Sequence, residues 1–289
     1  MTASVRVDTK ELSQLSSLLI DMNPNDDQPE ETHINNTGLL NFYVQSDREN
    51  PLLDVTFDGI HILNGDLVSP TPQIVASFTD ENRFLAMEDT SQFQMKVVYP
   101  DRSEKRVYFS SPEVLFIPAD GTNLENENKA TIEYSPTFEE DGIYTLKVEG
   151  QDVAGNQSGE LEYSIEFEII TKSMISNVLN YPNPFSTATR FVYTLTGNEQ
   201  PASFKIQIMS VSGRIVREIT QSELGEMKIG THQTDFVWDG TDEFGDKLAN
   251  GVYLYRVVAK NAAGEDIEQY ETGADKFFNQ GFGKMVIVR

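Results

Sequence analysis

The chain has 289 residues, of which 38% are hydrophobic and none is cysteine, and its formal net charge is −24. The lack of cysteine excludes disulfides, Cys-ligated zinc and a cysteine nucleophile on this chain. A charge of this sign argues against DNA or RNA as a partner, because the phosphate backbone would be repelled, and no run approaches the roughly 18 apolar residues of a membrane span.

The charge is distributed unevenly along the chain. Residues 1–170 hold 10 Lys and Arg against 32 Asp and Glu, a net of −22, whereas residues 171–289 hold 12 against 14, a net of −2. A chain of this length suits about two domains of roughly 100–150 residues each. We therefore predict a partial unit at residues 1–50, an acidic domain at residues 51–170 and a third domain at residues 171–289.

Residues 1–50 have the pattern of the last part of a β domain. Strands are predicted at Ser16–Asp21 and Thr37–Gln45, on either side of an acidic, turn-rich loop. Two strands cannot bury a face by themselves, so we expect them to pack on the next domain or to be poorly ordered. The N-terminus lacks the apolar region of a signal peptide, and we expect the sequence to be a piece of a longer protein. The order of several residues in this segment resembles the end of CARDB-type adhesion domains. These residues are Asp21, Asn23, Pro24, Glu30, Glu31, Asn35 and Asn36.

Residues 51–170 contain short alternating segments separated by turn signals. Along Gly142–Gln151, for example, Tyr144, Leu146 and Val148 share one face, which is the pattern of a half-buried strand. Six or seven short strands at this spacing predict a β-sandwich. The expected strands cover residues 53–59, 73–78, 93–99, 106–109, 129–134, 142–151 and 161–170.

Residues 171–289 predict a second sandwich, and we expect it to be held close to the first because no long Gly, Ser or Pro stretch separates them. Trp238 closes one alternating segment and Val252 opens the next, with Asp239-Gly240 and Asn250-Gly251 as turn residues between them. We expect these two flanks to form an antiparallel hairpin that organises the domain. The expected strands are 174–179, 189–195, 203–209, 215–220, 233–238, 251–259 and 284–288.

Candidate catalytic groups are few. The three histidines, His33, His61 and His232, belong to different predicted units, and no GxSxG elbow surrounds a serine. Tyr253 and Tyr255 lie on the face of their strand opposite Val252 and Leu254. They could form a sugar-stacking platform, or one face of the strand could be core and the other partly covered by a neighbouring domain, and we favour the second alternative. We expect this chain not to be an enzyme.

Calcium is the metal that the composition leaves open, because hard cations prefer carboxylate and carbonyl oxygens. No EF-hand motif occurs, and the simpler interpretation is that these carboxylates cap tight turns. We therefore assign no cofactor and keep calcium as an alternative. The two acidic groups are Asp239, Asp242, Glu243 and Asp246 in one loop, and Asp80, Glu81, Glu139, Glu140, Asp141 and Asp152 in several.

Short motifs of the last domain occur in a characteristic order and spacing. They are YPNPF at residues 181–185, IMSVSGR at 208–214, WDG at 238–240 with Asp242 and Gly245, and LANGVY at 248–253. Together they resemble the Ig-like domain that closes many proteins exported by the type IX secretion system, which is related to the Ig-like domain of the flagellar hook-capping protein. The predicted fold class is thus all-β, with tandem Ig-like β-sandwiches and a partial N-terminal β piece.

The resemblance also implies a sorting signal in the last strand. In that family the last strand is short, β-branched and flanked by basic residues, and the corresponding residues here are Lys284, Val286, Ile287, Val288 and Arg289. A strand at a sheet edge offers unpaired N–H and C=O groups to a receptor, so strand addition is one expected mode of recognition. The segment 262–282 is an insertion relative to the family pattern, which puts recognition by the standard machinery in doubt.

Phrases at residues 50–59, 80–85, 274–278 and 283–289 resemble the non-catalytic C-terminal modules of gingipain-like cysteine peptidases of the type IX sortase kind. The catalytic cysteine of that family has no counterpart here. The resemblance implies a non-catalytic region that spaces and addresses an upstream domain, with the type IX machinery and the upstream domains as partners and the outer membrane, the cell surface or the medium as destination, reached through the periplasm. The alternative is a surface adhesion module that binds a protein or a glycan.

Overall fold

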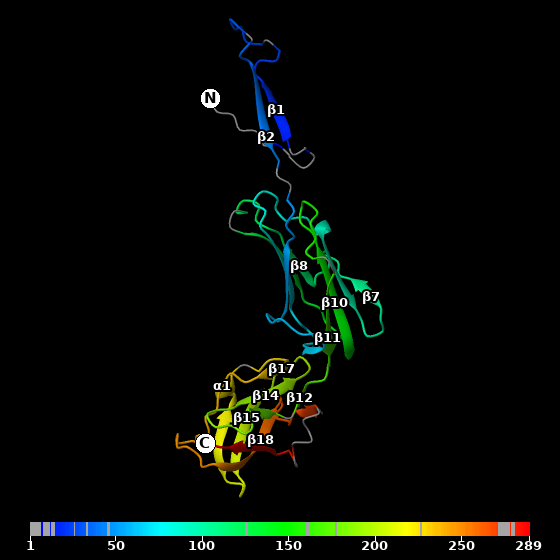
Figure 1. Ribbon diagram of the computed structural model, residues 1–289. Coiled ribbons are helices and arrows are strands. Elements are labelled where there is room, and N and C mark those ends of the chain that lie inside the picture. The colour runs from blue at the N-terminus through cyan, green and yellow to red at the C-terminus, as the bar shows by residue number, and fades with distance from the viewer. Residues whose placement is uncertain are drawn as a thin grey trace.

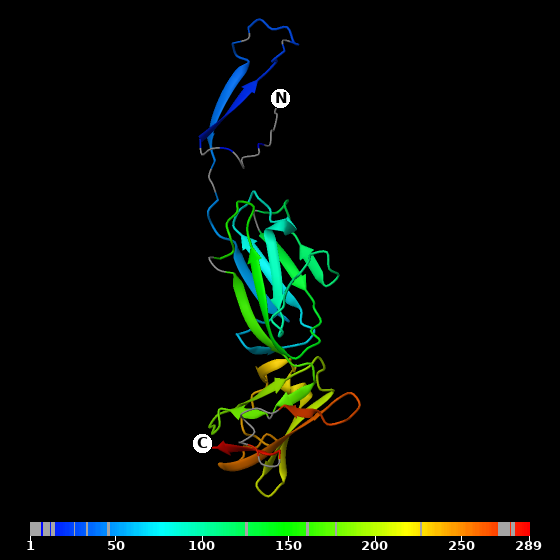
Figure 2. The ribbon, with the colours of Figure 1, turned by 90° about the vertical axis from the view of Figure 1, so that its right-hand side faces the viewer.

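The computed structural model describes residues 7, 12, 15–25, 27–32, 34–44, 47–124, 127–159, 162–176, 178–225, 227–270, 278 and 281–289. Strands dominate it, as predicted, and the helical elements among these described residues are one 3-10 turn (η1, Thr90–Gln92) and one short α-helix (α1, Gln221–Leu224). Figures 1 and 2 show a two-stranded hairpin, a first β-sandwich and a second β-sandwich following one another along an elongated molecule. The described part of the chain contains no helix with the length and apolar character that a membrane span requires.

The hairpin consists of β1 (Leu15–Asp21) and β2 (Thr37–Tyr43), paired antiparallel with Leu15 opposite Tyr43. Neither strand pairs with any other in the described part of the chain. Leu19 and Leu39 face each other with 67% and 66% of their surfaces exposed. The expectation that these strands pack on the next domain is therefore wrong, because the hairpin projects from the first sandwich (Figure 1).

The first sandwich is built from two antiparallel sheets. One of them is completed by an edge strand, β4, that runs parallel to its neighbour. Its strands fall largely where alternation predicts them, but β4 and β8 were not predicted, and β7 begins two residues before the expected segment. One sheet has the order β3 (Leu52–Phe57), β5 (Ile74–Asp80), β9 (Asn128–Tyr134) and β8 (Val114–Ile117). The other has the order β4 (Asp66–Val68), β11 (Tyr163–Ile169), β10 (Gly142–Gly150), β6 (Phe93–Val98) and β7 (Glu104–Arg106).

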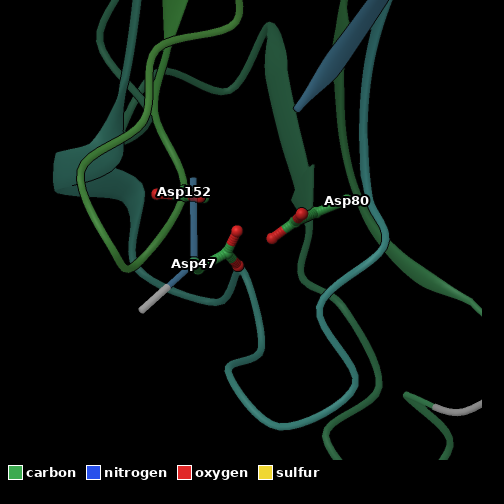
Figure 3. A group of neighbouring side chains, drawn as sticks. All are labelled: Asp47, Asp80 and Asp152. Atoms are coloured by element: carbon green, nitrogen blue, oxygen red, sulfur yellow. The ribbon is translucent and has the colours of Figure 1, made fainter. Parts of the chain in front are cut away.

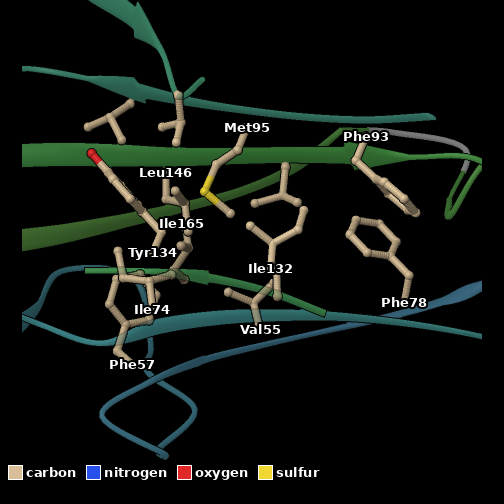
Figure 4. Close-up of a cluster of buried hydrophobic side chains, with 14 of the residues drawn as sticks. Val55, Phe57, Ile74, Phe78, Phe93, Met95, Ile132, Tyr134, Leu146 and Ile165 are labelled. Atoms are coloured by element: carbon tan, nitrogen blue, oxygen red, sulfur yellow. The ribbon is translucent and has the colours of Figure 1, made fainter. Parts of the chain in front are cut away.

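The core of the first sandwich lies between these sheets (Figure 4). On β10 the predicted face, Tyr144, Leu146 and Val148, is buried. The rings of Phe78 and Phe93 join the two sheets with their centroids 4.7 Å apart. Each fully buried side chain of this kind contributes about 1.5–3 kcal/mol, so the alternation along the strands fixes which face turns inward.

Over its described residues the second sandwich has nine strands, which form two further sheets. One sheet runs β13 (Leu179–Tyr181), β14 (Arg190–Leu195), β12 (Met174–Ser176) and β19 (Glu268–Tyr270), and β17 (Gly230–Gln233) also pairs with β14. The other runs β16 (Ile215–Thr220), β15 (Ser203–Ser210), β18 (Gly251–Lys260) and β20 (Gly283–Ile287).

The hairpin expected on either side of residues 239–250 does not form. Trp238 pairs with Thr189 of the β14 sheet, whereas β18 pairs with β15 and β20 of the opposite sheet. The loop therefore crosses from one sheet to the other, and the indole of Trp238, 1% exposed, donates a hydrogen bond to the carbonyl of Thr241 at 3.0 Å. Period-2 alternation predicts strands but does not choose their partners, and a loop of this length does not impose a hairpin.

The junction between the sandwiches is hydrogen-bonded from both sides. The Asp141 carboxylate accepts bonds from the backbone and hydroxyl of Thr171, both at 2.7 Å. From the second sandwich, the Gly197 N–H donates to the Ile170 carbonyl at 2.9 Å and the Thr196 hydroxyl donates to the Lys172 carbonyl at 2.7 Å. The connector is thus fixed rather than free, which agrees with its short length.

A glycine brings the two sandwiches into close contact. Gly230 of β17 has φ of 99°, and a Cβ added there would lie 2.7 Å from the Leu67 carbonyl oxygen of β4. Gly213, in the β15–β16 turn, has φ of 84° but no atom within 4 Å of an added Cβ. Both positions therefore favour glycine because of the positive φ, but only Gly230 must also lack a Cβ because of the contact across the junction.

We predict that Gly230→Ala loosens the junction and Gly213→Ala does not. Both variants lose about 1–2 kcal/mol because alanine is strained at positive φ, but only Gly230→Ala places a methyl group against Leu67. Spin labels on Tyr108→Cys and Phe244→Cys report the distance between the sandwiches by pulsed electron resonance. The distribution should shift and broaden for Gly230→Ala alone, and equal distributions would contradict the contact.

Candidate functional site

Three of the motifs that are scattered along the last domain, YPNPF, WDG and LANGVY, meet around β20 and the residues that follow it. The strand is the edge of its sheet and pairs with β18, with Val286 opposite Val252 and Ile287 opposite Gly251. Met285 and Ile287 are 0% and 1% exposed and belong to the core. Of the candidate sorting residues, Ile287 is therefore buried, Lys284 and Val286 lie on the opposite face, and Val288 follows the strand with 53% of its surface exposed.

The outer edge of β20 is closed by the YPNPF segment. The Asn183 amide donates to the Lys284 carbonyl at 2.8 Å and accepts from the Val286 N–H at 3.0 Å. Phe185 continues this pairing, because its N–H donates to the Val286 carbonyl at 3.0 Å and its carbonyl accepts from the Val288 N–H at 2.9 Å. The outward backbone groups from the Lys284 carbonyl to the Val288 N–H are thus paired. The expectation that this edge offers unpaired backbone groups is wrong for this part of the strand.

The two prolines explain why the side chain of Asn183, and not a backbone group, pairs with β20 at this point. Pro182 and Pro184 have no N–H group and cannot donate to a β ladder, so this segment cannot pair as an ordinary strand. The carboxamide of Asn183 presents one donor and one acceptor, as a backbone peptide does. The sequence showed an extended, proline-restricted segment at this point but did not show that Asn183 substitutes for a strand residue.

Arg289 fixes the residues that follow β20. Its guanidinium donates to the carbonyls of Leu248 at 2.8 Å and of Asp239 at 2.6 Å, and its backbone N–H donates to the Asn250 side chain at 3.0 Å. A Cβ on Gly240 would lie 2.6 Å from a guanidinium nitrogen of Arg289, so the glycine of the WDG motif makes room for this contact. Hydrogen bonds from a charged donor are roughly twice as strong as neutral ones, so Arg289 ties two motifs to the end of the strand.

The acidic loop after Trp238 uses its carboxylates within the protein. Asp239 accepts bonds from the backbone and hydroxyl of Thr241, at 3.2 and 2.7 Å. Asp242 accepts from the N–H groups of Phe244 and Asp246, both at 2.9 Å. Glu243 pairs with Arg217 at 2.8 Å. These contacts match the turn-capping interpretation better than the calcium alternative.

The second acidic group divides between the two ends of the first sandwich. Asp141 lies at the junction, whereas Asp80 and Asp152 meet at the opposite end, where Asp47 joins them (Figure 3). One carboxylate oxygen from each of these three residues lies within 4.8 Å of the others, and Asp80 and Asp152 are 5% and 2% exposed. Among the described residues these are the oxygens that could hold a hard cation. Asp152, however, already accepts two bonds from Asn156 at 2.7 Å.

The crowding of carboxylates changes the acidity of Asp80. Burial raises the pKa of Asp80 to about 6, and the neighbouring Asp47 carboxylate adds to the rise, while a hydrogen bond from the Asn82 N–H opposes it. Glu81 also raises this pKa through its charge. Near neutral pH the protein therefore holds a buried negative charge close to two others.

The two described histidines, His61 and His232, contact a carboxylate and a backbone carbonyl. His61 contacts Asp54 at 2.6 Å, and the Nε2 atom of His232 contacts the Ile229 carbonyl at 2.7 Å, while His33 lies outside the described residues. His61 and His232 do line one cavity of about 380 Å³ at the junction, together with Asp58, Asp66, Lys228 and Gln200. Sequence reasoning placed them in different units and missed this shared cavity.

The face of β18 that carries Tyr253 and Tyr255 belongs to the core of the second sandwich. Tyr255 is 1% exposed and its ring contacts Phe191 at a centroid distance of 5.9 Å. Tyr253 is half-buried, and its hydroxyl donates to the Ala249 carbonyl at 2.9 Å. The pair therefore cannot form an open platform for a sugar.

Comparison with known proteins agrees with the motifs of the last domain. Residues 182–263 match the family model of the FlgD Ig-like domain. A search of curated proteins gives no match.

Three solved structures illustrate the similarities to known folds. Dimeric latent PorU from Porphyromonas gingivalis is 18% identical with a TM-score of 0.34, over 87% of this chain and 22% of that one. The fibronectin(III)-like modules of Clostridium thermocellum CbhA are 12% identical with a TM-score of 0.23, over 75% and 95%. The BspA C-terminal domain of Streptococcus agalactiae is 9% identical with a TM-score of 0.24, over 76% and 98%. The chain thus spans 22% of the length of the PorU chain.

We predict that Asp80→Asn stabilises the protein at neutral pH. The folded-state pKa of about 6 lies above the ordinary value of 3.8, so the folded state binds more protons than the unfolded state between these values. Stability from this group is therefore present at low pH and lost as the pH rises through about 6.

Thermal melts from pH 4.5 to 8 test this expectation. Asp80→Asn should raise the melting temperature at pH 7.5 and flatten the pH dependence. Asp120→Asn is the control, because hydrogen bonds from Thr122 lower the pKa of that exposed carboxyl. A bound calcium ion would reverse the outcome, since Asp80→Asn and a chelator would then both lower the melting temperature at neutral pH.

We also predict that Asn183→Asp weakens the closure of β20. Aspartate keeps the acceptor for Val286 but loses the donor to Lys284 and sets a carboxylate against that carbonyl, which costs about 1–3 kcal/mol. Hydrogen exchange should accelerate at the Val286 and Val288 amides. Asn198→Asp, at an exposed position, is the control, and exchange that is equal in both variants would contradict the assignment.

Proposed function

We propose that this chain is a non-catalytic region that spaces and addresses an upstream domain for type IX secretion and cell-surface attachment. The observation that carries the proposal is the convergence of three separated motifs on β20: YPNPF closes its edge, and WDG and LANG receive Arg289, while the alternating strand itself fills the core. The FlgD Ig-like match over residues 182–263 supports the same assignment.

The junction supports the role of a spacer. Hydrogen bonds from Asp141, Gly197 and Thr196 hold the connector from both sides, and Gly230 packs against Leu67. A fixed connector keeps the second sandwich at a set distance and orientation from whatever precedes the first. A flexible linker would provide reach but not orientation.

The side chains in the sites analysed favour a structural role. Asp239, Asp242 and Glu243 are engaged in turns and an ion pair, and Tyr255 is packed in the core. On this proposal the catalytic chemistry belongs to an upstream domain of the gingipain-like peptidase kind. The partners are then that domain and the type IX machinery, and the route runs through the periplasm to the cell surface or the medium.

A second candidate is surface adhesion to a protein or a glycan. The junction cavity of about 380 Å³ favours it, because clefts between domains are common ligand sites. Binding on a glycan or host-protein array by the whole chain, with loss of binding in Gln200→Ala, would support adhesion.

An export assay tests the main proposal. The whole chain is fused behind a periplasmic reporter in a bacterium that has a type IX secretion system, and a mutant without that system is the control. We expect the reporter at the surface or in the medium only when the system is present, because the second sandwich carries the address. A reporter that stays in the periplasm of the competent cell would overturn the proposal.

A further inference from the structure

Backbone recognition is closed at both edges of the sheet that contains β20. Asn183 and Phe185 occupy the outer edge of β20, as described above. At the other edge, the N–H of Glu243 donates to the Val216 carbonyl of β16 at 3.2 Å, and the Glu243 carboxylate accepts from the Glu218 N–H. A receptor that binds this sheet must therefore contact its side chains, because these edge groups are not available to pair with an added strand.

The outward face of the sheet is unusually apolar near the end of β20. The register places Met209, Leu254 and Lys284 in one row across β15, β18 and β20, and Val252 beside Val286 in the next. The outer face of an antiparallel sandwich usually alternates to polar residues. Here β18 and β20 carry apolar residues on both faces at this end, so core packing alone does not explain their sequence.

Met209 is buried, with 6% of its surface exposed, and Leu254 and Val286 are half-buried, but the row continues into exposed side chains. Val252 is 37% exposed and Val288 is 53% exposed, and Ile215, which pairs with Met209 on β16, is 47% exposed. A contiguous apolar patch with a polar border is typical of an interaction site. We call the set Val252, Leu254, Val286, Val288, Lys284 and Arg256 the outer face.

The charges on this face differ from those of the molecule as a whole. Lys205 is neutralised by Glu218 at 3.2 Å and Lys260 by Asp266 at 3.1 Å. In the described part of the chain Lys284 forms no ion pair, and Arg256 donates to the Gln207 amide oxygen at 2.8 Å instead of to a carboxylate. Among the described residues, two cations without a carboxylate partner thus border an apolar patch on a chain whose net charge is −24.

We propose that the outer face docks an acidic protein surface that presents apolar side chains bordered by carboxylates. The inference rests on the proposed function, and it identifies the partner of the address by its chemistry. Charge complementarity selects the partner, because Lys284 and Arg256 would pair with carboxylates at the border while Val252, Leu254 and Val286 supply the buried area. An anionic bilayer fits less well, since it would repel the rest of this acidic chain.

The test uses variants that leave the core intact. Lys284→Glu with Arg256→Glu reverses both border charges, and Val252→Thr with Val286→Thr keeps the β-branched shape while removing apolar contact. The control is Arg106→Glu, which reverses an exposed cation on β7 of the first sandwich. Melting temperatures establish that each variant is folded, and all are introduced into the whole-chain reporter fusion.

We expect both double variants to lower surface delivery at least tenfold and the control to leave it unchanged. A cross-linker at position 286 in the wild-type fusion should capture a protein whose purified form binds the chain less tightly as NaCl rises from about 50 to about 500 mM. If the wild-type fusion reaches the surface and the variants of the outer face reach it equally well, this inference is wrong but the proposed function stands. Wild-type fusion that remains in the periplasm would remove the proposed function and this inference with it. If the cross-linker captures a second copy of this chain, or if the chain shows salt-sensitive binding to anionic vesicles only, the partner is not an acidic protein and this inference is wrong.

Discussion

The pairing of Asn183 and Phe185 with the outer edge of β20 is the contact on which the second sandwich depends. An open edge strand with an apolar sequence is a template for unwanted pairing, and β20 has such a sequence. Closing it with a proline-restricted segment removes the template without extending the sheet. The same contact brings residues 183 and 286 together, which lie far apart in the chain, so the two ends of the sandwich are held by one set of hydrogen bonds.

The sequence predicted the type and position of most strands because burial of one face imposes period 2. Along β10 the predicted face, Tyr144, Leu146 and Val148, is the buried one. Pairing was not predictable in the same way, since Trp238 and β18 both alternate but belong to opposite sheets. The short strands β4, β8 and β19 were missed because three or four residues carry too little alternation to be recognised. The division at residues 50 and 170 remains a prediction about folding units.

The candidate site was predictable in its residues but not in its geometry. The alternation placed Lys284 and Val286 on one face, and that face is now the proposed surface. The role of Asn183 could not be read from the sequence, because a side chain that replaces a backbone partner has no periodic signature. Similarly, Asp80 and Asp152 were grouped correctly, but Asp47 joins them through the segment before β3, and Asp141 lies at the far end of β10.

The rigid junction also determines whether the outer face remains available. The acidic half of the chain carries a net charge of −22, and on a flexible linker it could fold back and neutralise Lys284 and Arg256. Bonds to Ile170, Thr171 and Lys172 prevent that motion. Figure 1 shows β18 and the red terminal strand at the end of the second sandwich that is remote from the first. The fixed connector therefore does more than set a distance, because it keeps the molecule's own carboxylates away from the cations that a partner would contact.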